Sequence, residues 1–326
     1  MTTPSTTRKP LARVAIRRSE LTVPGHLPDL LRKAAASAAD EVMLDCEDAC
    51  PVSAKGDDVR GTIVEALRSL DWGTKAVFIR PNGRRTIYGA DDLAAIVCGA
   101  PNRFHGIIMP KVMDADDIVW LDDLLTRLEE EAGWTYRLQI EALIETARGL
   151  ENAQRIADAS DRMAALIFGI ADYAADLGMV DPMANQNIRF VYAKQRVVNA
   201  AKAAGLDAID NSHLHVRDLD GLRQACVEAV SYGFDGKWAL SPTHVPVINE
   251  VFSPPAAQLE RARKVIELYI RAGTEDRLGA LLDPDTGELL DEATIKIAAR
   301  TLRRGARAGL VDAEVVAALD RREGLL

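Results

Sequence analysis

Two carboxylates lie where the sequence could hold a metal ion. Glu145 and Asp172 each follow a short apolar segment of the kind that forms a buried strand. Oxygen ligands in this number suit Mg²⁺, or Mn²⁺ in its place, because such ions take one or two protein carboxylates and leave other positions to water and substrate. A zinc site is not expected, because no histidine lies at the end of such a segment. The alternative is a structural rim, in which the carboxylates pair with Arg80 and Lys111.

Arg80 is the cation best placed to act beside these carboxylates. It directly follows the apolar segment Ala76–Ile79, so its guanidinium should emerge near the same point. An arginine there can hold a carboxylate through two hydrogen bonds or stabilise an enolate oxygen. A salt bridge to Asp45 or Glu47 is the structural alternative.

Three further basic residues, Arg17, Arg18 and Lys33, form a small cluster near the first predicted strand. Such a cluster could hold phosphate groups, and a solvated surface patch explains it equally well. The net charge of −9, from 40 basic and 49 acidic residues, gives no basic surface of the kind that binds nucleic acid. An anionic ligand would therefore meet only local cationic contacts.

Short apolar segments alternate with amphipathic helical patterns up to Phe252. The predicted strands are Val14–Ile16, Glu41–Leu44, Ala76–Ile79, Gly106–Met109, Leu138–Leu143, Ala164–Phe168, Asp207–Ile209 and Lys237–Leu240. Brief segments that are apolar on both faces are typical of buried parallel strands. Separated by helices, they predict an α/β fold of the (β/α)8 TIM barrel type, with a doubly wound open sheet as the alternative. In such a barrel the active site lies at the carboxyl ends of the strands, where the residues above would converge.

The pattern changes after Phe252. Ser253-Pro254-Pro255 interrupts the chain, and helices are predicted over Ala256–Ala272 and from about Asp291 to Arg304. The predicted organisation is therefore a flexible N-terminus over residues 1–12, a catalytic barrel over 13–255, and a helical segment over 256–326. This last segment lacks the apolar mass to fold alone, so it should pack as a lid or in an oligomer contact.

Composition narrows the class of protein. The chain has 326 residues, of which 48% are hydrophobic, enough for one large core. Its four cysteines lack the spacing of a zinc site and are expected to be reduced thiols. No apolar run approaches the ~18 residues that a membrane helix needs, and the Thr/Ser/Pro-rich start has no apolar core of a signal peptide. A cytoplasmic enzyme without a nucleic-acid or membrane partner is expected.

A series of motifs runs in order from about residue 14 to residue 252. The motifs are Arg18-Ser19-x-Leu21-x-x-Pro24-Gly25, Leu44-Asp45-x-Glu47-Asp48-Ala49, Arg80-x-Asn82, Met109-Pro110-Lys111, Ile144-Glu145-Thr146-Ala147, Phe168-Gly169-x-x-Asp172 and Gly233-Phe234-x-Gly236-Lys237-Trp238-Ala239 with Pro242. Each motif is weak alone, but the series in this order is specific. Taken together, the motifs resemble the citrate lyase β-subunit / malyl-CoA lyase family of the HpcH/HpaI aldolase superfamily.

The resemblance implies a TIM barrel that binds Mg²⁺ through Glu145 and Asp172. It also implies a catalytic group in which Arg80 polarises a thioester and steadies its enolate, with Glu47 close by. Members of the family close the site with a C-terminal segment, often from the neighbouring subunit, that brings in an aspartate. The local match Leu290-Asp291-x-Ala293 assigns that role, a general base, to Asp291.

The coenzyme A part of the substrate would be contacted by the residues that match Arg18, Lys33 and Pro24. The implied reaction is reversible cleavage of a 3-hydroxydicarboxylic acyl-CoA, of the malyl-, β-methylmalyl- or citramalyl-CoA type. Its products would be an acyl-CoA and an α-keto acid such as glyoxylate or pyruvate. Homotrimers or homohexamers are implied as the assembly.

Three other functions stay open at this point. They are a citrate lyase β subunit that acts on a carrier-protein thioester, a malyl-CoA thioesterase or malate-synthase-type enzyme, and a non-catalytic barrel that binds coenzyme A. Two stretches also depart from the family pattern, Ser241-Pro242-Thr243-His244 and Asn211-Ser212-His213-Leu214-His215. Both are predicted at the mouth of the barrel, so they leave the preferred acyl and keto-acid groups open.

Overall fold

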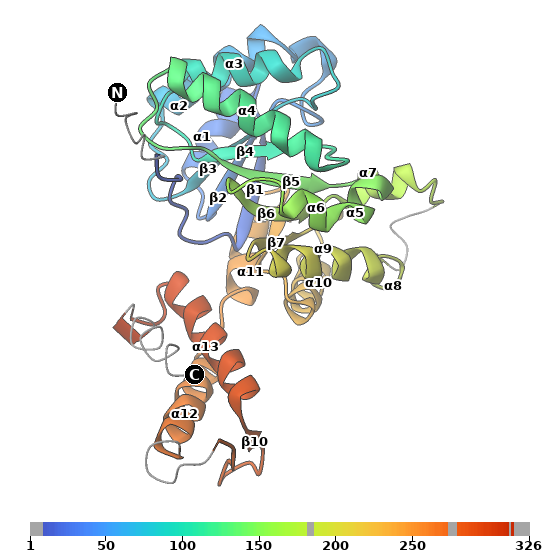
Figure 1. Cartoon of the computed structure of the whole chain (residues 1–326). Coiled ribbons are helices and arrows are strands. Elements are labelled where there is room, and N and C mark those ends of the chain that lie inside the picture. Colours follow the sequence, from blue (N-terminus) through green and yellow to red (C-terminus); the bar gives the residue numbers. More distant parts are fainter. Residues whose placement is uncertain (1–8, 181–185, 273–278, 313, 316–326) are drawn as a thin grey trace, which may run out of the picture. The chain divides into compact units, whose positions relative to one another are not determined.

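The structure is a computed structural model that describes residues 9–180, 186–272, 279–312 and 314–315 (Figure 1). The chain divides into two compact units, residues 1–252 and 253–326. The first eight residues of the predicted flexible N-terminus lie outside the described residues.

The first unit is a closed barrel of eight parallel strands in the order of the sequence, with β8 paired to β1. The strands are β1 (Ser19–Pro24), β2 (Glu41–Asp45), β3 (Ala76–Arg80), β4 (Gly106–Met109), β5 (Gln139–Ile144), β6 (Met163–Phe168), β7 (Asp207–Asp210) and β8 (Gly236–Ala239). The helices of this unit are α1 (Pro28–Ala35), α2 (Asp57–Ser69), α3 (Gly89–Gly99), α4 (Ala115–Glu131), α5 (Ala147–Glu151), α6 (Ala153–Ala157), α7 (Ile170–Asp176), α8 (Gln186–Arg189), α9 (Val191–Ala203), α10 (Leu219–Tyr232) and α11 (His244–Val251). The predicted TIM barrel is confirmed.

The first strand was predicted in the wrong place. It spans Ser19–Pro24 rather than Val14–Ile16, whereas β2 to β8 overlap the other predicted segments. The reason is that β1 alternates polar and apolar residues, with Glu20 and Thr22 facing inward, and so has no run of consecutive apolar residues. Arg17 and Arg18 therefore lie before β1, at the amino end of the barrel strands.

Side chains inside the barrel form three levels, because alternate residues of each strand point inward. Along β2 the inward residues are Glu41, Met43 and Asp45, and along β5 they include Glu141 and Leu143. The middle level is an apolar cluster composed of Met43, Ala76, Phe78, Ile108, Leu143, Ala165, Ile167, Ile209 and Trp238. This apolar level separates polar groups at the amino ends of the strands from polar groups at the carboxyl ends.

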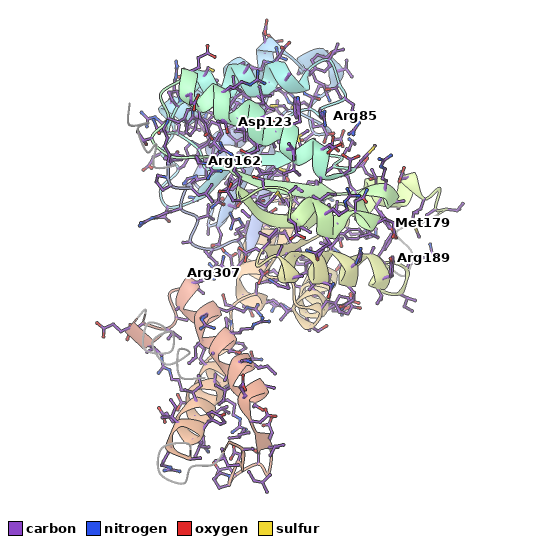
Figure 2. All side chains as sticks on the ribbon, viewed as in Figure 1. Arg85, Asp123, Arg162, Met179, Arg189 and Arg307 are labelled. Atoms are coloured by element: carbon purple, nitrogen blue, oxygen red, sulfur yellow. The ribbon has the colours of Figure 1, made fainter. Side chains whose placement is uncertain are left out.

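The outer face of the sheet packs against the surrounding helices through the largest apolar cluster of the chain. One arginine in this layer, Arg162, is almost fully buried and is labelled in Figure 2. Its guanidinium bonds to Asp122 at 2.5 Å and to Glu129 at 2.7 Å, both on α4. It thereby ties the turn before β6 to that helix. Between β5 and β6 the chain forms two short helices, α5 and α6, because Asn152 leaves the helical conformation between them.

The described part of the predicted flexible N-terminus, residues 9–12, is attached to the barrel. Ala12 donates its backbone N–H to Arg137 at 2.9 Å, and Arg137 donates to the carbonyl of Pro10 at 2.8 Å. Gln139 at the start of β5 donates from its side chain to the carbonyl of Ala12 at 2.8 Å. These residues therefore run beside the segment that leads into β5 and are not a free end.

The second unit contains α12 (Ala256–Arg271), the short strands β9 (Leu281–Leu282) and β10 (Leu289–Leu290), and α13 (Glu292–Arg307). Residues 283–288 form the turn of the antiparallel β9–β10 pair. The unit has a small core of its own, made of Leu259, Ala262, Val265, Ile266, Leu290, Ile295, Ala298, Ala299, Leu302 and Val311. Over the described parts of both units, the helices are too short or too polar to cross a membrane.

Candidate active site

Arg80 and Asp45 form a buried pair at the carboxyl ends of β3 and β2. The two residues face each other in the strand register, and Nε and Nη2 of Arg80 donate to the two Asp45 oxygens at 2.7 and 2.6 Å. Burial disfavours the charge on both groups, but their mutual attraction outweighs it. The pKa of Arg80 is therefore raised and the pKa of Asp45 is lowered. The salt bridge considered as an alternative thus exists, and it fixes the guanidinium in a charged state.

The remaining edge of the guanidinium is held by Glu47 and Trp238. Nη1 of Arg80 lies 3.5 Å from Oε2 of Glu47. The carbon of the guanidinium lies 5.2 Å from the centre of the Trp238 ring, a distance typical of a cation–π contact. The Trp238 indole N–H donates to Thr22, which keeps the ring in place. Trp238 was quoted in a motif but not predicted in the site; its inward position on β8 is the signal that could have identified it.

Glu145 follows β5 and is almost fully buried. Its Oε1 accepts a hydrogen bond from the backbone N–H of Lys111 at 2.7 Å. Burial raises the pKa of Glu145 well above its usual range, and the negative charges of Glu47 and Asp172 raise it further, although Arg80 and the Lys111 N–H oppose this. A buried carboxylate in this state favours a nearby cation.

Lys111 connects the carboxylates of the site. Its ammonium lies 2.6 Å from Glu47, 3.1 Å from Asp48 and 4.0 Å from Asp172. Burial opposes its charge, but Glu47 and Asp48 outweigh this and raise the pKa of Lys111. Its backbone has φ of 52°, a left-handed conformation that costs a non-glycine residue about 1–3 kcal/mol. This conformation turns the N–H toward Glu145 and the side chain toward Glu47, a role that the sequence did not reveal.

Asp172 lies in the first turn of α7, with 42% of its side chain exposed. The structure thus brings Glu145, Asp172, Arg80 and Glu47 together, as the sequence predicted. A deeply buried carboxylate with a raised pKa, beside a second carboxylate open to solvent, offers the hard oxygen donors that Mg²⁺ prefers. The donor chemistry of Glu145 and Asp172 therefore suits a Mg²⁺ ion.

The predicted coenzyme A contacts are spread over both ends of the barrel. Pro24 is the last residue of β1, in register with Asp45, and so lies at the mouth. Arg18 lies at the amino end of β1, where its Nε bonds to Asp40 at 2.7 Å. Lys33 is exposed in the last turn of α1, which leads back toward the amino ends of the strands. The structure does not bring Arg18 to the group around Arg80.

Asp291 belongs to the second unit, where it is the N-cap residue of α13. Its Oδ1 accepts from the backbone N–H and the hydroxyl of Thr294, each at 3.0 Å. These hydrogen bonds lower the pKa of Asp291. His244, one of the departures from the family pattern, is buried at the start of α11, with Nε2 2.9 Å from the carbonyl oxygen of Val216.

The parallel eight-stranded barrel, with a buried guanidinium and several carboxylates at the carboxyl ends of its strands, defines a TIM-barrel enzyme. The chain belongs to the HpcH/HpaI aldolase/citrate lyase family, whose model matches residues 18–242. It is an enzyme of the carbon–carbon lyase class, as its named relatives are.

Similar proteins cover nearly the whole chain. An L-malyl-CoA/β-methylmalyl-CoA lyase of Rhodobacter capsulatus is 31% identical over 311 residues, which cover 91% of this chain and 96% of the relative. Citrate lyase subunit beta of Leuconostoc mesenteroides subsp. cremoris is 30% identical over 303 residues, covering 92% and 96%. A crystal structure of CitE from Mycobacterium tuberculosis in complex with magnesium, acetoacetate and coenzyme A is similar with a TM-score of 0.72 at 26% identity. That similarity covers 90% of this chain and 100% of that chain.

Proposed function

We propose that the protein is a Mg²⁺-dependent lyase that reversibly cleaves a 3-hydroxydicarboxylic acyl-CoA, of the malyl-, β-methylmalyl- or citramalyl-CoA type. The products are an acyl-CoA and an α-keto acid such as glyoxylate or pyruvate. The observation that carries the proposal is the Arg80 guanidinium, buried and aligned by Asp45 beside the Glu145 carboxylate. Similarity to the malyl-CoA/β-methylmalyl-CoA lyase supports the substrate class, and the magnesium and coenzyme A bound to the mycobacterial protein support both ligands.

Arg80 acts on the charge that develops as the carbon–carbon bond breaks. When C2 and C3 of the acyl chain separate, the bonding electron pair passes to C2 and the thioester carbonyl, which becomes an enolate. The C3 hydroxyl loses its proton and becomes the keto group, and C2 then takes up a proton from Asp291, so one proton is lost and one is gained. A guanidinium that is already aligned stabilises this oxygen without reorganising during the reaction. Nη1 is the nitrogen available for this, because Nε and Nη2 are engaged by Asp45. Glu47, bonded to Lys111, holds Nη1 in position.

Glu145 and Asp172 hold the Mg²⁺ ion. When bound, Mg²⁺ supplies Lewis-acid polarisation of the oxygen that becomes the keto group. The backbone N–H of Lys111 fixes the orientation of the Glu145 carboxylate, and its ammonium group offsets part of the negative charge of Asp172.

The second unit serves as the lid. In the direction of bond formation, Asp291 removes a proton from the acyl carbon next to the thioester, as a general base. In a homotrimer or homohexamer this aspartate comes either from the same chain or from the neighbouring subunit. Closure excludes water from the enolate, which would otherwise be protonated. Pro24, at the mouth, lies on the coenzyme A side of the substrate.

The test is product identification with a matched pair of arginine variants. Protein dialysed against chelator is supplied with Mg²⁺ and a panel of 3-hydroxyacyl-CoA thioesters, and the products are identified by mass spectrometry. Wild type should release acyl-CoA and keto acid in equal amounts. Arg80→Lys should lose activity by roughly 10²-fold or more, because a lysine cannot keep the two-point contact with Asp45.

The control is Arg84→Lys, in the loop that follows β3, where the side chain is directed toward Asp117 and Trp120. It should retain wild-type rates. Release of free coenzyme A together with the intact hydroxyacid would show a thioesterase instead. Binding of the thioesters without turnover of any of them would show a non-catalytic barrel. Either result would exclude the lyase proposal.

A further inference from the structure

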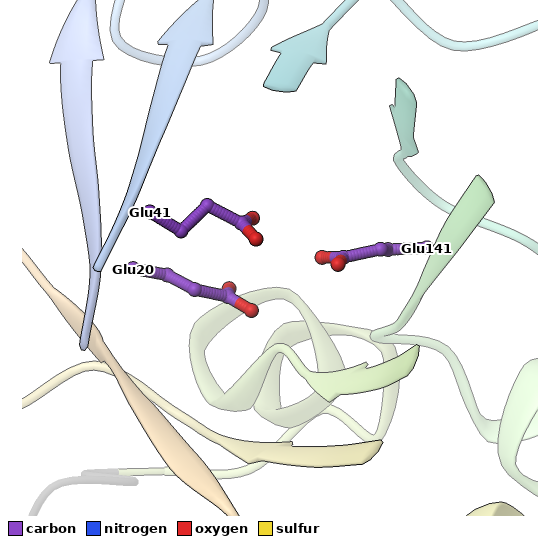
Figure 3. Close-up of side chains that lie close together, drawn as sticks. All are labelled: Glu20, Glu41 and Glu141. Carbon is purple, nitrogen blue, oxygen red and sulfur yellow. The ribbon is translucent and has the colours of Figure 1, made fainter. Parts of the chain in front are cut away.

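A second group of carboxylates lies inside the barrel, at the end opposite the active site. Glu20, Glu41 and Glu141 come from β1, β2 and β5, and all three side chains are fully buried. Figure 3 shows the three carboxyl groups pointing toward one another from different strands. One oxygen from each lies within 4.8 Å of the oxygens from the other two. The interior of the barrel therefore contains a compact cluster of acidic groups away from water.

Within the part of the chain that the structure describes, most oxygens of these carboxyl groups have no hydrogen-bond partner; the exception is Oε1 of Glu141, which accepts from Arg17. Both oxygens of Glu20, both of Glu41 and Oε2 of Glu141 accept no hydrogen bond from any described residue. A buried polar atom left in this way costs on the order of 1–3 kcal/mol, and more when it is charged. Because five such atoms face one region, the folded chain needs something else there to satisfy them.

Arg17 balances only part of the charge. Its Nε lies 2.6 Å from Glu141 and 3.3 Å from Glu41, and its Nη1 lies 3.1 Å from Asp207, which is 15% exposed at the edge of the group. One guanidinium against three fully buried carboxyl groups would leave an excess of two negative charges with all three ionised, and burial together with mutual repulsion raises the pKa of each of them. A divalent cation would cancel that excess and supply the missing partner for the carboxylate oxygens.

This cluster is separate from the active site. Glu41 and Asp45 lie at the two ends of β2, roughly 13 Å apart along a parallel strand. Met43 and the rest of the apolar middle level lie between them. An ion bound at one end therefore does not share ligands with an ion at the other.

We propose that Glu20, Glu41 and Glu141 bind a divalent cation of the oxygen-preferring class, such as Mg²⁺, Mn²⁺ or Ca²⁺. The ion fastens β1, β2 and β5 together at the amino end of the barrel, and its role is structural. Carboxylates on three strands are hard ligands of the type that these cations take. All three side chains are fully buried, so the ion should exchange slowly. The alternative is that no cation binds and that two protons are shared among the three carboxyl groups.

The experiment counts metal that stays with the protein. Protein from Mn²⁺-supplemented medium is desalted, and manganese per chain is measured by plasma mass spectrometry. Asp172→Asn removes a ligand at the mouth only and should keep one Mn²⁺ per chain. Adding Glu20→Gln or Glu41→Gln to that variant should remove it. Any difference in manganese content between wild type and Asp172→Asn measures metal bound at the mouth. The proposed active-site metal can therefore be wrong without changing the manganese counted at the glutamate cluster.

Thermal unfolding distinguishes a bound cation from protonated carboxyl groups at the glutamate cluster. Glutamine reproduces a protonated glutamate in shape and in hydrogen bonding. With a bound cation, the Tm of Asp172→Asn should fall after warming with EDTA, and the Tm of the Glu20→Gln double variant should no longer respond. Absence of manganese from Asp172→Asn, with a Tm that EDTA leaves unchanged, would mean protonated carboxyls and overturn the proposal. If the double variants do not fold, these two measurements on Asp172→Asn decide alone.

Discussion

A Cβ atom at Gly169 would lie 2.6 Å from the Cβ of Glu145 and 2.7 Å from its Oε2. Gly169 has φ of −99°, so its backbone conformation is open to any residue. The glycine is therefore required because it has no side chain, which lets the Glu145 carboxylate pass between the ends of β5 and β6. This contact explains why the motif Phe168-Gly169-x-x-Asp172 joins a glycine to a proposed metal ligand.

Gly169→Ala should weaken Mg²⁺ binding. The added methyl group must push the Glu145 carboxylate away from the Lys111 N–H, and disturbing the support of a ligand typically costs 10–100-fold in metal affinity. Titration calorimetry with Mg²⁺ measures the change. The control is Gly61→Ala, on α2, where an added Cβ meets no atom within 4 Å. It should leave the affinity unchanged, whereas equal affinity in Gly169→Ala would remove Glu145 from the metal site.

Asp45→Ala should reduce both stability and turnover. It leaves the Arg80 guanidinium buried without its main partner, and breaking a buried pair in this way costs about 3–5 kcal/mol. Urea unfolding measures the stability. In kinetics, kcat should fall more than KM rises, because the guanidinium loses its alignment with the enolate oxygen. The control is Asp48→Asn. The Asp48 carboxylate contacts Lys111 from an exposed position, so its loss should change the free energy of unfolding by less than about 1 kcal/mol.

A second buried ion group lies between the barrel and its helices. Asp210 at the end of β7 contacts Lys237 of β8 at 2.5 Å and Lys194 of α9 at 3.1 Å. Burial raises the pKa of Asp210, but the two ammonium groups outweigh it and hold that pKa below the usual value. The lysine of the motif Gly236-Lys237-Trp238 therefore has a structural partner.

The stability contributed by Asp210 should depend on pH. Because its pKa is lower in the folded than in the unfolded chain, its contribution is full above the unfolded value, near ~3.9. It is lost as the pH falls through the folded value. Asp210→Asn should therefore cost about 3 kcal/mol at neutral pH, and the difference from wild type should shrink below about pH 4. Urea unfolding at several pH values tests this; a difference that stays constant with pH would mean that packing, not charge, is responsible.

The sequence predicts β2 to β8 well because those strands are short and apolar. Gly106–Met109 was predicted with the bounds that the structure has, and the other six overlap their segments. β1 was missed because its polar residues Ser19, Glu20 and Thr22 leave it without a run of consecutive apolar residues. β2 and β5 also place glutamates inside the barrel, but each keeps three consecutive apolar residues, Val42–Leu44 and Ala142–Ile144.

Misplacing β1 also misplaced Arg17 and Arg18. With the strand at Val14–Ile16, both arginines appear at the mouth, as candidates for phosphate contacts. The structure places Arg18 beside Asp40 and Arg17 among the buried glutamates, at the other end. The positions of Glu20, Glu41 and Glu141 in the sequence do not predict this cluster, because the three side chains come together only through the register of three separate strands.

Glu145, Arg80 and Asp172 were predicted at the mouth because a residue that follows a barrel strand must emerge there. The contacts between them could not be found in this way. The left-handed backbone of Lys111 and the placement of Trp238 over Arg80 depend on side-chain packing between strands that are far apart in sequence.

Asp291→Asn tests the proposed general base without damaging the helix that carries it. Asparagine caps a helix about as well as aspartate, so the hydrogen bond to Thr294 and the start of α13 should be preserved. The amide cannot accept a proton, however. The low pKa of Asp291 keeps the wild-type side chain ionised, and thus able to act as a base, at neutral pH.

The measurement is exchange of the acyl-CoA protons next to the thioester with D2O, followed by NMR in the presence of Mg²⁺ and absence of keto acid. Asp291→Asn should abolish this exchange and the condensation reaction together, while binding of the acyl-CoA stays near that of wild type. Glu292→Gln, the exposed neighbour in the first turn of α13, is the control and should exchange at the normal rate. If Asp291→Asn exchanges as fast as wild type, the base is another residue, and the second unit acts by enclosing the substrate rather than by moving the proton.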